Sequence, residues 1–196
     1  MDENPESEIA ESLAPSAGSA ANAFAAGDVE EILRERGWLG LGAGADSEDC
    51  ALRLQDWLAR AAALLGAHAA DGAALAELLG LIFHYDATAT LATRDAQAVM
   101  MRTGAREVIR ESAKIVLDGA AIDSERFKEI IEGLKLRVRF RSRELFYPLR
   151  LALAGRVGEG ELDRVILLLD SAKALGFAGR VKGTRERMLE FCAALE

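Results

Sequence analysis

From Ser47 onward the chain repeats one pattern: apolar residues three or four positions apart, bounded by residues that cap helices. This spacing lines one face of an α-helix with apolar side chains, which a protein core can then cover. Alanine and leucine, with 37 and 28 of the 196 residues, add high helix propensity, whereas aromatic residues make up only 6%. The sequence therefore predicts an all-α protein, a helical bundle or cage of roughly seven to nine helices.

Capping chemistry indicates where these helices begin and end. Short polar side chains accept hydrogen bonds from the first free N–H groups of a helix, and proline is tolerated at its first position. Helix starts are therefore expected at Asp28, at Asp71, at Asp123 or Ser124, and at Pro148. Because glycine ends or interrupts helices, ends or breaks are expected at Gly37, Gly66, Gly104, Gly133 and Gly155.

The first 26 residues differ from the rest of the chain. They are rich in alanine and serine, include five acidic residues and lack lysine and arginine. Such a segment cannot bury enough apolar surface to offset the entropy of ordering it. Residues 1–26 are therefore expected to form a disordered acidic tail, and residues 27–196 a helical domain. The stretch GLGAGA at 40–45 matches the letters of the dinucleotide fingerprint, but a charged helix precedes it instead of a buried strand. It is interpreted as a loop.

The sequence carries no sign of a membrane span or of secretion. No run reaches the roughly 18 to 20 apolar residues that a spanning helix needs. The acidic N-terminus is unlike a signal peptide, which begins with positive charge. Cys50 and Cys192 lie far apart without a CxxC pair, as expected for free thiols in a reducing compartment. A cytoplasmic location is therefore predicted.

The net charge of −8 excludes a uniformly basic nucleic-acid binder, but the charge is unevenly distributed. Residues 133–156 contain seven basic residues and one acidic residue, a local charge of +6, so the remainder of the chain carries −14. From 135 to 143 the basic residues alternate with mostly apolar ones. In an extended conformation these five cations would project from one side, with Leu136, Val138 and Phe140 on the other.

Guanidinium groups suit phosphates because each offers planar, bidentate donors. The basic segment is therefore interpreted as a strip that binds a polyanion. The alternative is a solvated edge that pairs with the acidic helices of the same protein. The candidate nucleic-acid-binding residues are Lys135, Arg137, Arg139, Arg141, Arg143, Arg150 and Arg156.

The residues that follow the strip, LFYPLRLALAG at 145–155, resemble a signature of the C-terminal, anticodon-binding region of bacterial glutamyl-tRNA synthetases. In that family a short loop and a helix follow, and GEL at 160–162 with VILLL at 165–169 stand in the matching places. FKEII at 127–131 and FHYD at 83–86 are similar to elements further upstream. The similarity is sharp over 145–169, weakens back to about residue 48, and does not extend to 1–26 or 177–196.

The resemblance implies an all-helical cage over residues 48–176 that holds the anticodon stem and loop of a tRNA, with 177–196 as an extra C-terminal helix. The H-x-G-H and K-M-S-K elements of the family's catalytic half do not occur in the sequence. A stand-alone module that is not an enzyme and needs no cofactor is therefore implied. Its expected partners are tRNA and a separate synthetase catalytic chain. The alternative is a helical protein-interaction module that no longer binds RNA and that docks an acidic protein partner.

Two positions depart from the family pattern. Ala154 stands where the family has threonine, and Gly160 where proline is common, with the acidic Glu159 beside it. These changes are expected either to alter base preference or to weaken RNA binding. Arg150 matches the family's arginine, where it can either contact RNA or pair with a carboxylate or helix carbonyls of the protein itself.

Other chemistry-bearing residues give weaker signals. His68 and His84 lack a clustered third ligand, so no metal site is predicted. Neither cysteine has a base placed beside it in the sequence, as a nucleophile would require. Phe140 is the aromatic residue put forward for stacking on an unpaired base, because Phe146 and Tyr147 lie within the helix-entry signature.

Overall fold

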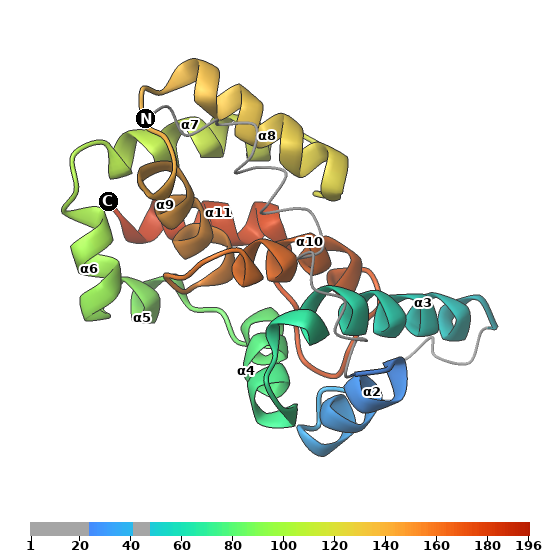
Figure 1. Ribbon diagram of the computed structural model, residues 1–196. Coiled ribbons are helices and arrows are strands. Elements are labelled where there is room, and N and C mark those ends of the chain that lie inside the picture. The colour runs from blue at the N-terminus through green and yellow to red at the C-terminus, as the bar shows by residue number, and fades with distance from the viewer. Residues whose placement is uncertain (1–23, 41–47) are drawn as a thin grey trace.

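The computed structural model describes residues 24–40 and 48–196, and this part of the chain is all helical (Figure 1). The predicted all-α class is therefore confirmed. The count exceeds the expected seven to nine, because the threonine-containing stretch after Asp86 forms two short helices. The described α-helices are α2 (Ala26–Glu35), α3 (Glu48–Leu65), α4 (Gly72–Phe83), α5 (Ala87–Leu91), α6 (Arg94–Met100), α7 (Ala105–Leu117), α8 (Ser124–Arg137), α9 (Arg143–Ala154), α10 (Glu161–Lys173) and α11 (Thr184–Ala194), with a 3-10 turn at Gly66–His68.

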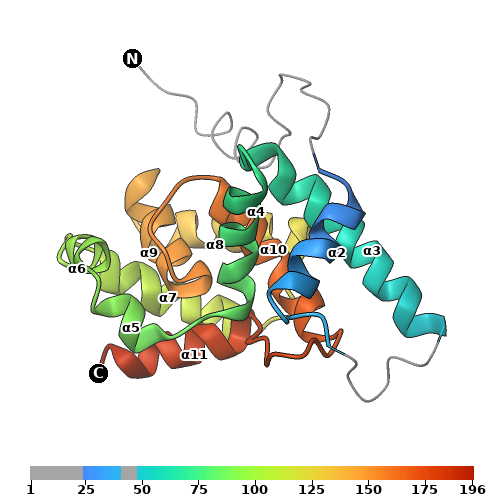
Figure 2. The ribbon, with the colours of Figure 1, turned by 90° about the horizontal axis from the view of Figure 1, so that it is seen from below.

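Helices α9 and α10 form the centre of the molecule. In α10 every residue from Leu162 to Leu169 is buried, and nine of the twelve residues of α9 are buried. A helix that is covered on all sides needs neighbours on all sides. Helix α10 packs against α3, α4, α9 and α11, and α9 packs against α6, α7 and α11. In Figures 1 and 2, α2 and α3 lie at one end of this pair and α5–α7 at the other. The segment that carries the sharpest family resemblance is thus the core of the fold.

Several predicted helix boundaries are confirmed by their hydrogen bonds and dihedral angles. The side chains of Asp71 and Asp123 accept hydrogen bonds from the N–H groups of Ala74 and Arg126, so both are N-caps. Helix α6 is separated from α7 by Gly104, which has a φ of +90°. At the end of α9, Gly155 has a φ of +76°. This left-handed conformation costs glycine little and other residues much.

Two other boundaries differ from the prediction. Asp28 is the third residue of α2 and not its N-cap: its carboxylate accepts a hydrogen bond from the N–H of Ala25, and the helix begins two residues earlier. Gly133 lies inside α8, which continues to Arg137. A Cβ atom at Gly133 would lie only 3.3 Å from Cδ1 of Ile115. Glycine at this position therefore permits close packing of α8 on α7 and does not end the helix.

Pro148 was expected at the first position of its helix and is instead the sixth residue of α9. Proline has no N–H, so it cannot donate to the carbonyl of Glu144 four residues earlier. The helix nevertheless begins at Arg143, because Leu145 and Phe146 pack into the core from its first turns. Burial of apolar side chains outweighs the single backbone hydrogen bond that proline removes.

The last helix is tied to the core by a completely buried arginine. The guanidinium of Arg187 donates hydrogen bonds to the carbonyls of Lys182, Leu153, Leu81 and Ile82 at 2.7–2.9 Å and stacks on the ring of Tyr85. Three of these carbonyls lie at the C-terminal ends of α4 and α9, where the helix dipole is negative. Burial lowers the pKa of Arg187 to about 10, so it stays protonated at neutral pH.

Some predictions concern segments outside the described residues. Residues 1–23 of the expected tail and positions 41–45 of the glycine-containing stretch belong to this group. Ala26, placed in the tail by the sequence, begins α2. Within the ranges that the structure covers, no helix combines the length and the apolar character needed to cross a membrane.

Candidate nucleic-acid interface

The basic segment from Lys135 to Arg143 is not an extended strand. Lys135 and Arg137 belong to the last turn of α8, residues 138–142 form a turn, and Arg143 begins α9. The prediction of an extended segment, with cations on one side and apolar residues on the other, is therefore wrong. The side chain of Val138 is buried, whereas Leu136 is 88% exposed. The segment completes α8 and then bends, so its apolar residues do not share one face. Val138 is buried at the end of α8, and Phe140 packs against Gly104 at the start of α7.

Arg150 is not available to a ligand as an exposed cation. Its side chain is only 5% exposed, and its Nε and Nη2 atoms each donate to the carboxylate of Asp163 at 2.7 Å. A third donor, Nη1, bonds to the carbonyl of Gly158 at 3.1 Å. The sequence left open whether Arg150 contacts RNA or pairs within the protein. The structure places it in a buried, bidentate ion pair that connects α9 to α10.

Four further candidates have carboxylate partners at the surface. The pairs are Lys135 with Glu132 at 3.5 Å, Arg137 with Glu111 at 3.9 Å, Arg143 with Glu159 at 3.4 Å, and Arg156 with Glu77 at 4.0 Å. Exposed pairs of this kind contribute about 0–1 kcal/mol each and break readily. These pairs reduce the local positive charge, but an anion that binds more strongly can displace the carboxylates.

Arg139 and Arg141 differ from the other candidates. Both are exposed, and neither has a carboxylate partner in the part of the chain that the structure describes. Arg141 donates only to the nearby carbonyls of Val138 and Phe140. The next residue, Ser142, has a φ of +49° and a ψ of −134°, and the N–H of Glu144 donates to the carbonyl of Arg141. This is the geometry of a type II′ turn with a serine where glycine is preferred.

A second basic row lies on α7 and the turn before it, and sequence reasoning missed it. Its three α7 members recur every fourth residue, a spacing that places side chains on one helical face, and Arg102 precedes them at the same spacing in the turn before the helix. This periodicity was the available signal. It was masked because α7 also contains glutamates and falls outside the segment of highest positive charge. The row comprises Arg102, Arg106, Arg110 and Lys114.

Contacts connect the two basic segments into one basic surface. Glu111 of α7 accepts from Lys114 at 2.6 Å and lies 3.7 Å from Arg110 and 3.9 Å from Arg137. One carboxylate thus serves three cations, and the hydrogen bond from Lys114 lowers the pKa of Glu111. We call these exposed cations the basic surface, which comprises Arg102, Arg106, Arg110, Lys114, Arg137, Arg139, Arg141 and Arg143.

Phe140 serves a structural role beside this surface. Its ring covers Gly104, and a Cβ atom at that glycine would lie 1.9 Å from the ring's Cζ atom. Phe140 is half-buried and packs against the core. The contact holds the turn 138–142 against the start of α7 and so brings Arg139 and Arg141 near the α7 row. Whether Phe140 also stacks on a base stays a prediction.

Tyr147 and Glu159 form a polar cluster at the edge of the basic surface. The hydroxyl of Tyr147 donates to Oε1 of Glu159 at 2.6 Å, and this hydrogen bond raises the pKa of Tyr147. The guanidinium of Arg102 lies over the tyrosine ring, 5.7 Å from its centroid. Arg143 and Arg150 approach the carboxylate of Glu159 from the same region, at 3.4 Å and 3.8 Å.

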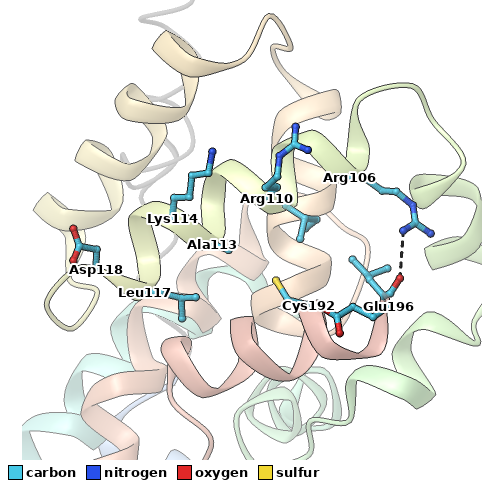
Figure 3. Close-up of a pocket in the computed structure, with 10 residues that line it drawn as sticks. Arg106, Arg110, Ala113, Lys114, Leu117, Asp118, Cys192 and Glu196 are labelled. Carbon is cyan, nitrogen blue, oxygen red and sulfur yellow. Dashed lines mark hydrogen bonds between the residues drawn. The ribbon is translucent and has the colours of Figure 1, made fainter.

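A groove of about 740 Å³ lies between α7 and α11 (Figure 3). Apolar side chains from both helices line it, whereas cations of the α7 row stand along its edge. Arg106 crosses one end of the groove and donates to the carbonyl of Leu195 at 3.3 Å. The apolar lining is formed by Ile109, Ala113, Leu117 and Leu195, together with the Cys192 thiol, whose pKa is raised by burial.

No three histidine, cysteine or acidic side chains within residues 24–40 and 48–196 come together as metal ligands. Burial lowers the pKa of His68, which favours its neutral form. Cys50 and Cys192 are free thiols in the structure.

Comparisons with protein-family models, with curated proteins and with solved structures find no match for this chain. The structure shows an all-α fold whose described residues include the basic surface defined above.

Proposed function

We propose that the protein is a non-catalytic RNA-binding module that holds the backbone phosphates of a tRNA on its basic surface. The supporting observation is the way the fold joins the α7 row to the turn 138–142, leaving Arg139 and Arg141 exposed without carboxylate partners in the described chain. Guanidiniums in this state can donate two hydrogen bonds to a phosphate. The choice of tRNA, and of its anticodon stem and loop, rests on the family resemblance of residues 145–169.

The residues assigned to this role differ from those expected from the sequence alone. Arg150 leaves the set because it is buried against Asp163, and Lys135 contributes little because its side chain is only 17% exposed. Arg156 lies outside the basic surface, beside Glu77. Arg137, Arg139, Arg141 and Arg143 stay, joined by the α7 row.

The direct test is a titration of fluorescently labelled, unfractionated tRNA with the full chain at several salt concentrations. Binding through phosphates predicts an affinity that falls steeply with salt, since each neutralised phosphate adds about 0.7–0.9 to the log–log slope. Absence of binding at tens of micromolar in low salt would exclude the proposal, because non-specific complexes already reach about 10⁻⁴–10⁻⁶ M.

A matched pair of variants locates the contact. Replacing Arg139 and Arg141 together by glutamine should weaken tRNA binding about tenfold and reduce the salt slope by roughly 1.4–1.8, the value for two phosphate contacts. The control replaces two exposed arginines of other helices, Arg94 and Arg185, by glutamine and removes the same charge. If both pairs weaken binding equally, only the net charge matters and the proposed surface is wrong.

A second candidate function is a helical interaction module that docks an acidic, amphipathic segment of a partner protein. The groove between α7 and α11 favours this candidate, because its apolar lining and its row of cations are complementary to such a segment. The part of α7 from Arg106 to Leu117 is about 18 Å long at 1.5 Å per residue, enough for three turns of a bound helix.

The two functions share the cations of the α7 row but predict different further contacts, which one nuclear magnetic resonance titration can separate. An acidic amphipathic peptide should shift the methyl signals of Ile109 and Leu117 if the groove is a docking site. tRNA should shift the arginine side chains of the turn 138–142 instead. A separate synthetase catalytic chain stays a proposed partner in trans and would be detected by co-purification. The tRNA-binding role is proposed for the cytoplasm.

A further inference from the structure

Glu159 lies in a place where its carboxylate is surrounded by donors. It belongs to the loop between α9 and α10, and its side chain is 57% exposed. The Tyr147 hydroxyl donates to Oε1 at 2.6 Å, Nη2 of Arg143 lies 3.4 Å from the same atom, and Nη1 of Arg150 lies 3.8 Å from Oε2. Three side chains of α9 thus converge on one anionic group.

These donors are held in position by the rest of the fold. The guanidinium of Arg150 keeps its hydrogen bonds to Asp163 and Gly158 and has the ring of Phe146 4.8 Å away, so it supplies fixed positive charge beside the site while Tyr147 and Arg143 supply the donors. Tyr147 is held under the guanidinium of Arg102. Arg143, with a side chain 71% exposed, forms the outer side and belongs to the basic surface. Donors that are already oriented can bind an oxyanion without an added cost of ordering.

We propose that this cluster is a phosphate-binding site of the RNA interface and that Glu159 occupies it until a phosphate displaces its carboxylate. The inference rests on the proposed function, since the phosphate is assigned to the RNA backbone. A carboxylate and a phosphodiester each present two oxygens to the same donors. Displacement is feasible because an exposed ion pair contributes little and the Glu159 side chain can rotate into solvent.

The proposal gives Glu159 a competitive role. While the Glu159 carboxylate stays in place, it repels an incoming phosphate and occupies the donors of Tyr147 and Arg143. Replacing Glu159 by glutamine should therefore strengthen tRNA binding. One unit charge removed at about 4 Å in a well-solvated site corresponds to roughly a fivefold change in affinity.

The experiment compares the full chain with its Glu159→Gln and Glu144→Gln variants by tRNA titration at several salt concentrations. Glu144 is a suitable control because it is an exposed glutamate next to Arg143 in the sequence, and its replacement changes the net charge equally. We expect Glu159→Gln to bind about fivefold tighter, with a salt slope steeper by about 0.7–0.9 for the added phosphate contact. Glu144→Gln should change affinity less than twofold.

A second pair of variants tests whether the gain passes through Arg143. Arg143→Gln should cost more affinity in the Glu159→Gln protein than in the unaltered protein, because only there does the arginine bind a phosphate. Equal losses in both backgrounds, or equal effects of Glu159→Gln and Glu144→Gln, would overturn the inference while leaving RNA binding in place.

A titration with inorganic phosphate supplies a readout that needs no RNA. The Nε–H signal of Arg143 should shift at several-fold lower phosphate concentration in Glu159→Gln than in the unaltered protein or in Glu144→Gln. If no form binds tRNA but this difference is seen, the proposed function fails and the oxyanion site stands. If the three proteins titrate alike, the site itself is wrong, whatever the result with tRNA. As a check on the geometry, Glu159→Gln should also lower the pKa of Tyr147, followed by its absorbance.

Discussion

Arginines of this protein occupy two contrasting environments. Arg150 and Arg187 lie in the core, and their guanidiniums contact carboxylates, carbonyls and aromatic rings of the protein itself. Arg139 and Arg141, on the turn between α8 and α9, lie at the surface without a carboxylate partner among the described residues. The same side chain thus connects helices in one region and offers free donors in the other.

Burial, and not residue type, therefore determines which arginines have a structural role and which are available to bind a ligand. A buried guanidinium must satisfy its donors within the protein, because an unpaired charge in the core is very costly. An exposed guanidinium is already solvated and can exchange water for phosphate. Arg150 and Arg143 are only seven positions apart in the sequence, yet they fall on opposite sides of this division.

The largest expected effect is at Arg187. Replacing it by methionine keeps much of the side-chain volume but leaves carbonyls of α4, α9 and the loop before α11 without their donor. We expect a loss of about 3–5 kcal/mol in the free energy of unfolding, measured by urea denaturation. Arg185→Met is the control, because Arg185 is exposed on the same helix, and it should change stability by less than about 0.5 kcal/mol. Similar losses in the two variants would contradict the structural role of Arg187.

A somewhat smaller effect is expected at the ion pair of Arg150 and Asp163. Arg150→Met leaves a carboxylate that is 0% exposed without its main partner, which should cost about 3 kcal/mol. Adding Asp163→Leu removes the stranded charge and should restore much of that loss, as double-mutant unfolding experiments can show. If Arg150 acted mainly as an RNA contact, Arg150→Met would instead leave stability unchanged and reduce only tRNA affinity.

Gly104 affects the position of the exposed arginines, because its lack of a side chain lets Phe140 pack the turn 138–142 against the start of α7. Gly104→Ala would place a Cβ atom 1.9 Å from the Phe140 ring at a residue with a φ of +90°. Strain and the displaced ring should together cost about 2 kcal/mol. The turn would also shift, so tRNA binding by the folded variant should weaken. Gly27→Ala is the control, because a Cβ atom there meets no other atom within 4 Å.

The smallest effect, and one of opposite sign, is expected at Ser142. Its φ of +49° is strained for serine and accessible to glycine. Ser142→Gly should raise the free energy of unfolding by up to about 1 kcal/mol, because it relieves that strain. A measurable loss of stability would show that the serine side chain contributes more than its backbone conformation costs. Ser142→Gly changes the turn 138–142 itself, whereas Gly104→Ala changes the residue against which Phe140 of that turn packs.

The sequence predicts the helical class and several helix boundaries, but neither which helices are central nor which charged residues are buried. The apolar period of residues 162–169 identifies a helix, and the structure shows that helix at the centre. The alternation from Lys135 to Arg143 suggested an extended strip, but the same letters continue α8 and then bend. Short alternating segments are ambiguous, because their apolar residues can pack with different helices instead of forming one face of a strand.

Arg187 and the α7 row show a different limit. Arg187 lies in a segment without a recognisable motif, and its buried partners come from positions about 100 residues away in the chain. The α7 row has a visible four-residue spacing, but its proximity to the turn 138–142 depends on helix packing. A pattern along the chain does not report which distant carbonyl or carboxylate will lie beside a given side chain.

Local features follow from the amino-acid sequence: helix periodicity, the caps at Asp71 and Asp123, the glycine break at 104, and the concentration of positive charge in residues 133–156. These features depend on neighbours within one or two helical turns. The burial of Arg150 and Arg187, the position of Glu159 among donors, and the joining of two basic segments into one surface follow from the packing of the helices. Those outcomes depend on long-range packing, because it determines which charges are removed from water and which stay exposed to it.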